Sequence, residues 1–409
     1  MAVQTISQRF PLLAHNRPFR WLWISTFFTT FEDVLAFTAL TLYVLGLSGS
    51  GAALASLFAL QTLMALLAGP LAGMVSDRFN RKRVWLAASG VIALTYSLYP
   101  FAESLEQLYV LVAIVGVAFT FARNAGLSLL PDLVEEKSLV DANALLSVNF
   151  NAALIVAPLV GGGLVAAFGA HAAFYLLAGL RVTAILCVSR IAYRRAGPAV
   201  TLARHWLDDL REGLQYARAH AEVRPLLLTA LGTNLGVGAL QVLEPLLVTQ
   251  VLGQGAGGYG LLLSVAGLGA MSGSLLIPRV TARWPIFHVF AMSVLLTGLS
   301  FFPYAHLLWF PVTLIIVIPQ TATWVMGNVL SDTIVQRSVQ GAVRGRIFGL
   351  FMLIHNAMTL LAMGLLALLV DRVGVALLMD AAGLIYAGAG VYALLVMRRF
   401  AAQAAVSTA

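Results

Sequence analysis

Long apolar stretches recur along the whole chain and are separated by short polar segments. Each stretch runs for about 18–25 residues, the length that an α-helix needs to cross the hydrocarbon core of a bilayer. Unpaired backbone groups are not tolerated in lipid, so runs of this length indicate helices rather than the shorter strands of a barrel. The pattern predicts twelve membrane-spanning helices, at residues 20–44, 52–74, 84–102, 108–130, 142–168, 171–192, 225–251, 258–279, 286–303, 307–332, 346–370 and 374–397.

The composition supports an integral membrane protein. The chain has 409 residues, of which 60% are hydrophobic and 10% are charged, whereas a soluble domain is typically about 25% charged. The net charge of +8 does not indicate a nucleic-acid partner, because the basic residues are spread among short loops. The single cysteine, Cys187, falls inside a predicted span and is expected to be a small core residue.

Charge in the loops predicts the orientation of the chain. Basic residues fill alternate loops, and the opposite loops hold only Arg372. By the positive-inside rule, both termini are expected in the cytoplasm of a cell that carries the protein in its inner membrane. The polar residues 1–18 lead directly into the first span, so no cleaved signal peptide is expected.

The longest polar segment predicts the division of the chain. Residues 193–224 separate an N-terminal six-helix bundle, residues 1–192, from a C-terminal six-helix bundle, residues 225–409. Within this cytoplasmic linker an amphipathic helix is expected on the membrane surface, with its apolar positions at Trp206, Leu210, Leu214 and Ala217. Weak similarity between the halves, such as Asn151-Ala152 and Asn356-Ala357, predicts an all-α fold of two pseudo-symmetric bundles enclosing a midplane cavity. A monomer is expected.

Charged residues inside the spans point to transport. Glu32 and Asp33 lie in the middle of the first span, where a carboxylate costs about 2.5–3.5 kcal/mol on insertion scales. Such acids carry protons, bind cations or pair with charges across a pathway, and the alternative is a purely structural hydrogen-bonding role. Arg181 in the sixth span and Arg123 in the fourth need counter-charges, and for Arg123 these are expected to be Asp33 or Asp132.

Polar residues also recur at helical spacing in the second half of the chain. In otherwise apolar spans, such stripes are typical of a cavity wall, and interhelical hydrogen bonding is the alternative. Together with Arg123 and Arg181, these residues are the predicted substrate cavity: Asn234, Gln241 and Glu244 in the seventh span, Gln320, Trp324 and Asn328 in the tenth, and His355 and Asn356 in the eleventh.

The loop after the second span carries a recognisable motif. A glycine is followed four residues later by Asp-Arg and then by a basic cluster, at Gly73, Asp77, Arg78, Arg81, Lys82 and Arg83. This motif resembles the loop 2–3 signature of the major facilitator superfamily. The resemblance implies that the loop acts as a gate between two bundles.

Segments 16–20, 121–134 and 141–162 look like the enterobactin-exporter and macrolide-efflux branch of that superfamily. In this branch Pro158, Gly161 and Gly162 would form the antiporter motif, although Ala157 replaces the usual glycine before the proline. The position of Asp33 resembles that of the acid which this branch carries in its first span. The resemblance therefore implies that Asp33, with Glu32 beside it, couples transport to protons.

The expected function is secondary active transport by alternating access. The cargo would be an amphipathic organic molecule such as a drug, macrolide or siderophore, exported in exchange for protons, with no other cofactor and no metal. A lysophospholipid or another lipid is an alternative cargo, and a receptor without flux is a further reading that the intramembrane charges oppose. An enzyme is not expected, because the sequence has no Ser/His/Asp set, no Cys/His metal spacing and no phosphate-binding loop.

Overall fold

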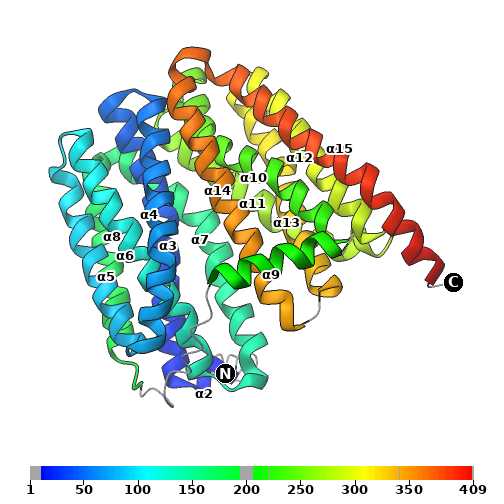
Figure 1. Cartoon of the computed structure of the whole chain (residues 1–409). Helices are drawn as coiled ribbons and strands as arrows, with labels where there is room; N and C mark the ends of the chain where they lie inside the picture. Colours follow the sequence, from blue (N-terminus) through cyan, green and yellow to red (C-terminus); the bar gives the residue numbers. More distant parts are fainter. Residues whose placement is uncertain (1–10, 194–205, 221, 340, 408–409) are drawn as a thin grey trace, which may run out of the picture. The chain divides into compact units, whose positions relative to one another are not determined.

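The computed structural model describes residues 11–193, 206–220, 222–339 and 341–407, and for residues 11, 206–210, 341–342 and 398–407 it describes the helical backbone only. Every regular element in this part of the chain is a helix (Figure 1). Twelve of the described helices are long and apolar enough to cross a membrane, which confirms the predicted all-α fold and its twelve spans.

The first half contains six long helices: α3 (Arg17–Ser48), α4 (Gly51–Arg78), α5 (Arg81–Leu98), α6 (Leu105–Leu133), α7 (Leu139–Phe168) and α8 (Ala170–Ser189). The second half contains another six: α10 (Val223–Leu246), α11 (Ala256–Thr281), α12 (Ile286–His306), α13 (Phe310–Ser338), α14 (Gly341–Val373) and α15 (Val375–Ser407). Five short elements complete the described chain: α2 (Pro11–His15), η1 (Tyr99–Phe101), η2 (Glu136–Ser138), α9 (Trp206–Ala219) and the π-helical η3 (Leu247–Val251).

Contacts divide the chain into two compact units. Unit 1 comprises Met1–Gly49, Leu60–Leu202 and Ala256–Ser264, and unit 2 comprises Ser50–Ala59, Ala203–Gly255 and Val265–Ala409. Helices α4 and α11 therefore each contribute residues to both units. The division expected at residues 193–224 stays a prediction.

Local sequence signals set where the helices begin. The Asn16 side chain accepts a hydrogen bond from the backbone of Phe19 at the start of α3, and Ser104 forms a capping box with Gln107 at the start of α6. These side chains satisfy backbone N–H groups that the first turn of a helix leaves unpaired. The span expected at 307–332 begins too early, because α13 starts at Phe310, where Pro311 occupies the first turn.

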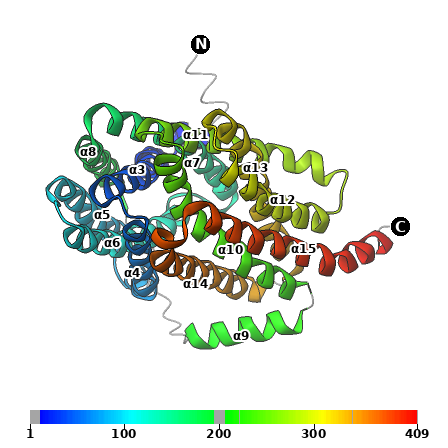
Figure 2. The same cartoon turned by 90° about the horizontal axis from the view of Figure 1, so that it is seen from above.

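In unit 1, α3 packs against α7 and α8, while α5 packs against α6 and α8 (Figure 2). The indole of Trp23 on α3 donates to the carbonyl of Leu145 at 3.0 Å, and the Asn149 amide donates to the carbonyl of Trp23 at 2.9 Å. These two hydrogen bonds fix the register of α3 on α7.

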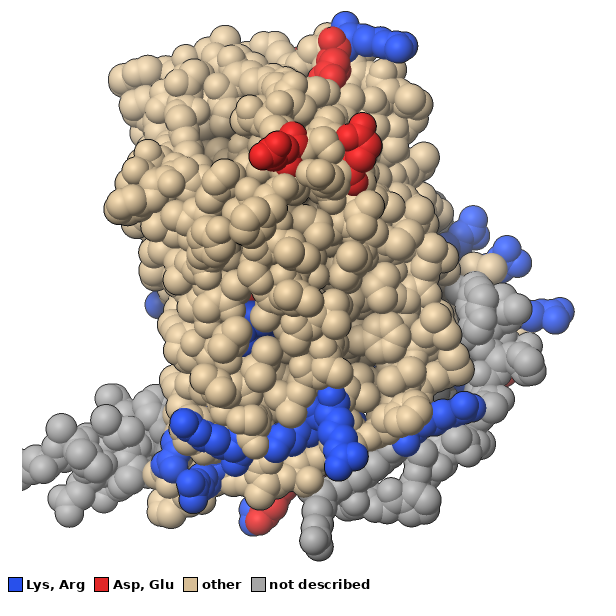
Figure 3. All heavy atoms as spheres, turned by 90° about the vertical axis from the view of Figure 1, so that its left-hand side faces the viewer, with Lys and Arg blue, Asp and Glu red and all other residues tan. Residues whose placement is uncertain are grey.

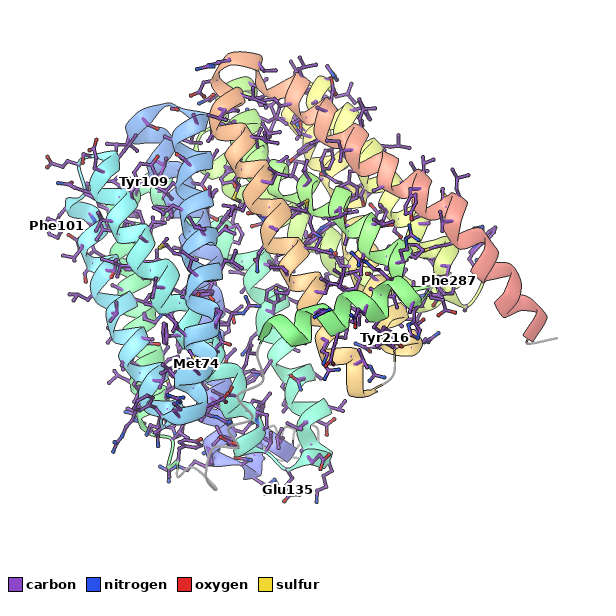
Figure 4. All side chains as sticks on the ribbon, viewed as in Figure 1. Met74, Phe101, Tyr109, Glu135, Tyr216 and Phe287 are labelled. Carbon is purple, nitrogen blue, oxygen red and sulfur yellow. The ribbon has the colours of Figure 1, made fainter. Side chains whose placement is uncertain are left out.

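Helix α6 runs the length of the unit, from the end where Figure 4 labels Phe101 and Tyr109 to the end where it labels Glu135.

Helix α7 and the first turns of α11 approach each other through glycines. A Cβ atom on Gly162 would lie 2.8 Å from the Cα atom of Gly260, and one on Gly260 would lie 2.9 Å from the Cα atom of Gly162. Small residues at such a crossing let two membrane helices pack backbone against backbone.

In unit 2, α10 packs against both α14 and α15, and α12 packs along α15 (Figure 2). Helix α9 lies against α14, where Gly213 is next to the backbone of Arg346 and Glu212 forms an ion pair with the Arg346 side chain. Of the predicted amphipathic face, Ala217 is buried and Leu214 is exposed, while the side chains of Trp206 and Leu210 lie outside the described residues. The expected membrane-surface position of α9 stays a prediction.

We expect Gly162→Ala to lower the free energy of unfolding by about 1–3 kcal/mol, because the new methyl group meets backbone that cannot move aside. Gly163 is the matched control: it lies in the same helix and a Cβ there would meet nothing within 4 Å. Thermal melting of both variants in detergent checks this. Equal melting temperatures for Gly162→Ala and Gly163→Ala would show that the two backbones are not in close contact.

Candidate functional site

The most deeply buried charges of unit 1 form one cluster halfway along the spans. The Nη2 atom of Arg181 on α8 donates to the Oε1 atom of Glu32 on α3 at 2.7 Å, and its Nε atom lies 2.7 Å from Oε2. The same Nη2 atom is 3.3 Å from Oδ1 of Asp33. Arg181 therefore forms ion pairs with two neighbouring carboxylates, those of Glu32 and Asp33.

The two carboxylates differ in their access to the surroundings. The side chains of Glu32 and Arg181 are 0% and 3% exposed, whereas that of Asp33 is 36% exposed. Successive residues of a helix point about 100° apart, so Glu32 faces α8 while Asp33 lies at the edge of the contact. Of the two acids, Asp33 is therefore the more exposed.

Two further residues complete the charge cluster. Tyr96 on α5 is buried and lies close enough to interact with Glu32, so three helices converge on this carboxylate. Arg123 on α6 is exposed, and its positive charge acts on Asp33 from a longer distance than Arg181. The expected alternative partner, Asp132, is instead bound by Arg81 at 2.7 Å and by the Tyr193 hydroxyl at 2.6 Å.

The burial of these charges depends on their pairing. An arginine does not lose its proton in a protein, so burying Arg181 requires carboxylates beside it. Two carboxylates and one guanidinium leave the three-residue core of the cluster with a net charge of −1. A proton on Asp33 makes that core neutral, and so does a cation bound beside it.

The predicted gating loop ties α5 to its neighbours at one end of unit 1. Arg81 also donates to the carbonyl of Ser128, and the Lys82 ammonium donates to the carbonyls of Ser189 and Ile191 at 2.7 Å each. The start of α5 is thereby fixed to the ends of α6 and α8. The remaining predicted residues of the loop, Gly73, Asp77, Arg78 and Arg83, lie on α4 and α5 at the same end.

On the face in Figure 3, most Lys and Arg side chains lie towards the lower end, and acidic side chains, with a basic one beside them, lie towards the upper end. On this face few charges lie between the two ends, as expected for a surface that meets lipid.

The antiporter-like motif lies in α7. A Cβ atom on Gly161 would lie 3.3 Å from the Leu35 side chain, so this glycine brings α7 close to α3 two residues after Asp33. Pro158 lies inside α7, and its carbonyl faces Gly260. The motif therefore shapes the packing around the charge cluster without contributing polar side chains to it.

In unit 2, two of the predicted cavity residues contact each other. The Nδ1 atom of His355 on α14 lies 2.7 Å from Oδ1 of Asn234 on α10. Glu244, three turns further along α10, accepts a hydrogen bond from the Tyr304 hydroxyl of α12 at 2.6 Å.

The remaining predicted cavity residues of unit 2 do not join these pairs in any described hydrogen bond. Gln320 on α13 is 2% exposed, and neither its side-chain oxygen nor its nitrogen has a described partner. Trp324 and Asn328 are exposed on the same helix, and Gln241 and Asn356 are partly buried. Their role in a substrate cavity stays a prediction.

Several residues of the clusters could not be selected from the sequence. Tyr96 and Tyr304 are ordinary aromatic residues of apolar spans, and no spacing rule links them to Glu32 or Glu244. Asp371, at the end of α14, accepts hydrogen bonds from the Ser50 hydroxyl at 2.6 Å and the Gly51 backbone at 2.9 Å, and so caps the start of α4.

Within the described residues no three His, Cys, Asp or Glu side chains lie together in a way that could hold a metal.

Unit 1 also contains an apolar cavity of about 640 Å³ between α4, α5 and α6. Its lining is entirely hydrophobic and includes Met64, Val84, Val91, Ile114 and Phe121. Val91 and Ile114 are exposed, so the cavity opens at the surface of the unit.

Twelve helices that are long and apolar enough to cross a membrane, with an ion pair buried among them, define the class of polytopic membrane proteins. Residues 22–363 match the Major Facilitator Superfamily, and the chain belongs to that family. It is a multi-pass membrane protein.

Individual relatives are distant. The uncharacterized MFS-type transporter YfiS of Bacillus subtilis is 29% identical over 54% of each chain, so the match spans about half of that relative's length. The multidrug efflux pump Tap of Mycolicibacterium fortuitum is 26% identical over 79% of this chain and 80% of its own. The crystal structure of the POT family transporter PepTSo superimposes with a TM-score of 0.78 at 15% identity, over 94% of this chain and 98% of that chain, which is a likeness of fold.

We expect Arg181→Gln to destabilise the protein by about 3–5 kcal/mol, because it leaves the buried Glu32 without its cation. Glu32→Gln combined with Arg181→Gln should recover much of that loss, since the fully buried carboxylate is removed with its cation and the remaining acid, Asp33, is 36% exposed. Melting temperatures and yields of the folded single and double variants in detergent check the coupling. If the double variant were less stable than Arg181→Gln alone, the pair would not be the source of the loss.

Proposed function

We propose that this protein is a proton-coupled exporter of amphipathic organic molecules, with Asp33 as the coupling carboxylate. The observation that carries the proposal is the unequal sharing of Arg181. Both carboxylate oxygens of Glu32 contact the Arg181 guanidinium, and this side chain is fully buried. Asp33 makes one longer contact to Arg181 and is 36% exposed.

The charge count of the cluster supplies a mechanism of exchange. With Asp33 ionised, the core of the cluster carries one excess negative charge, which favours a cationic or polarised group of a substrate beside it. With Asp33 protonated, that attraction disappears and the substrate is released. Proton and substrate then compete for one carboxylate, which is the requirement for antiport when access to the site alternates between the two sides of the membrane.

The family and a relative support the direction and the cargo. Tap is named a multidrug efflux pump and aligns with most of this chain. The basic loops, including Arg81, Lys82 and Arg83, favour a cytoplasmic position for that end of the spans, with both termini in the cytoplasm of an inner membrane. The protein would then export its cargo as a monomer that uses the inward proton gradient.

We expect Asp33→Asn to abolish substrate-driven proton movement, because an amide cannot exchange a proton, while the Glu32–Arg181 pair keeps the fold intact. Inside-out vesicles with a pH-sensitive dye are energised and then given macrolides, siderophores or cationic dyes. Glu106→Gln, which removes an exposed acid at the start of α6, is the control and should behave as the wild type. Proton flux retained in Asp33→Asn would remove Asp33 from the coupling role.

A second candidate function is the transport of a lysophospholipid or another lipid. The observation that favours it is the wholly apolar cavity between α4, α5 and α6, which opens at the surface, together with the exposed Arg123 two residues beyond Phe121 on α6. Acyl chains suit such a lining and a headgroup phosphate suits an arginine. Movement of fluorescent lysolipid across proteoliposomes, without an effect of drugs on proton flux, would favour this function over drug export.

A further inference from the structure

Glu244 is a further carboxyl group within the spans, and its surroundings differ from those of Glu32. It lies on α10 in unit 2 and is partly buried, and its Oε1 atom accepts a hydrogen bond from the Tyr304 hydroxyl at 2.6 Å. The Tyr304 side chain is itself buried, at 1% exposure. Among the described residues, none of the ion pairs includes Glu244.

Among the described residues, no charged side chain of the helices packed against α10 acts on this carboxyl group, and Arg372 at the end of α14 is exposed. On α14, His355 faces Asn234, and on α15 the Tyr386 ring faces Gly236. Both positions are eight or more residues before Glu244 on α10, or about 12 Å away along the helix. Asp380 on α15 is paired with His306.

Asp371 at the end of α14 is also committed elsewhere, since it binds Ser50 and Gly51. Tyr304 is therefore the polar group that acts on Glu244 directly.

The chain around Glu244 departs from regular helix. Pro245 follows it inside α10, which ends at Leu246, and the five residues Leu247–Val251 then form the π-helical turn η3. Single π-helical turns occur often at functional sites, because they reposition side chains at some loss of regular hydrogen bonding. Glu244 lies seven residues before the end of this span, or about 10 Å from it.

These observations separate the intramembrane acids by chemistry. Glu32 has a guanidinium against both oxygens, and this contact favours its ionised form. Glu244 has one neutral donor, and a lone carboxylate in an apolar span is expensive unless it takes up a cation. A proton is the cation that needs no further ligands, whereas a metal ion would need several oxygens.

We propose that Glu244, held by Tyr304, is a proton-binding site in unit 2, separate from the Asp33 cluster and reached from the end of the span opposite the cytoplasmic loops. The site deepens the proposed proton-coupled export and rests on it for its role in transport, although proton binding itself can be tested without transport. The carboxyl group takes up one proton and becomes neutral, and the Tyr304 hydroxyl continues to donate to the other oxygen.

Dicyclohexylcarbodiimide tests the protonation state directly, because in apolar surroundings it reacts with protonated carboxyl groups. The acid proton passes to the carbodiimide nitrogen, the carboxylate oxygen adds to its central carbon, and the adduct rearranges to a stable acylurea. The full chain in native membranes is treated over a range of pH and digested, and the peptides are quantified by mass spectrometry. We expect labelling at Glu244 that falls about tenfold per pH unit once the group ionises, and no labelling at Glu32.

Matched variants keep the test decisive if one of them folds poorly. Glu244→Gln should lose the label completely, and Tyr304→Phe should keep it, because the tyrosine orients the carboxyl group but does not supply the proton. An unlabelled Glu244 across the pH range, in protein that melts as the wild type, would overturn the proposal. Protection of Glu244 by sodium ions at constant pH would overturn it also, in favour of a metal-cation site.

Transport separates this inference from the proposed function. In vesicles in which the wild type shows substrate-driven proton flux, Glu244→Gln should lower the number of protons moved per molecule of substrate. Labelling at Glu244 without any proton flux in the wild type would defeat the proposed function and leave the proton site standing. Proton flux with an unchanged ratio in Glu244→Gln would overturn the part of Glu244 in coupling and leave the proposed function standing.

Discussion

The permanent positive charge of Arg181 constrains the centre of unit 1 more than any other interaction. Because a buried guanidinium cannot shed its proton, α8 can pack inward only where α3 supplies carboxylates. Glu32 meets that need with two short contacts, and Tyr96 brings α5 to the same point. The packing of α3, α5 and α8 against one another thus depends on the charge of Arg181. That charge is buried and is compensated by protein side chains.

Adjacent acids acquire different chemistry from helix geometry alone. Glu32 and Asp33 are neighbours in the sequence, yet one is sealed against Arg181 and the other remains accessible. Glu244 shows a third situation, a carboxyl group whose described partner is a neutral hydroxyl. The three acids therefore divide into a fixed counter-ion, an accessible member of an ion cluster and an acid with no cation. This division is what makes separate structural and proton-binding roles reasonable in one chain.

Small residues and loop charges set the packing around these groups. Gly161 and Gly162 let α7 approach α3 and the first turns of α11. The physical contribution of these two glycines of the antiporter-like motif is the absence of a side chain at a close helix contact. At the end of unit 1, Arg81 and Lys82 bind Asp132 and the last carbonyls of α8. The basic loop is thereby an internal tie between α5, α6 and the end of α8.

The sequence by itself determined the twelve spans, the all-helical class and the presence of intramembrane charge, because the length and hydrophobicity of each span are local properties that lipid imposes on every membrane helix. It also singled out Glu32, Asp33, Arg181 and Glu244, since a charge in an apolar run is visible without neighbours. Only the tertiary structure decided that Arg181 belongs to Glu32, that Asp132 belongs to Arg81 and not to Arg123, and that Tyr304 holds Glu244. Those pairings join residues 51 to 149 positions apart. These pairings depend on which faces of two helices meet. The periodicity within one span does not indicate which other helix that span packs against.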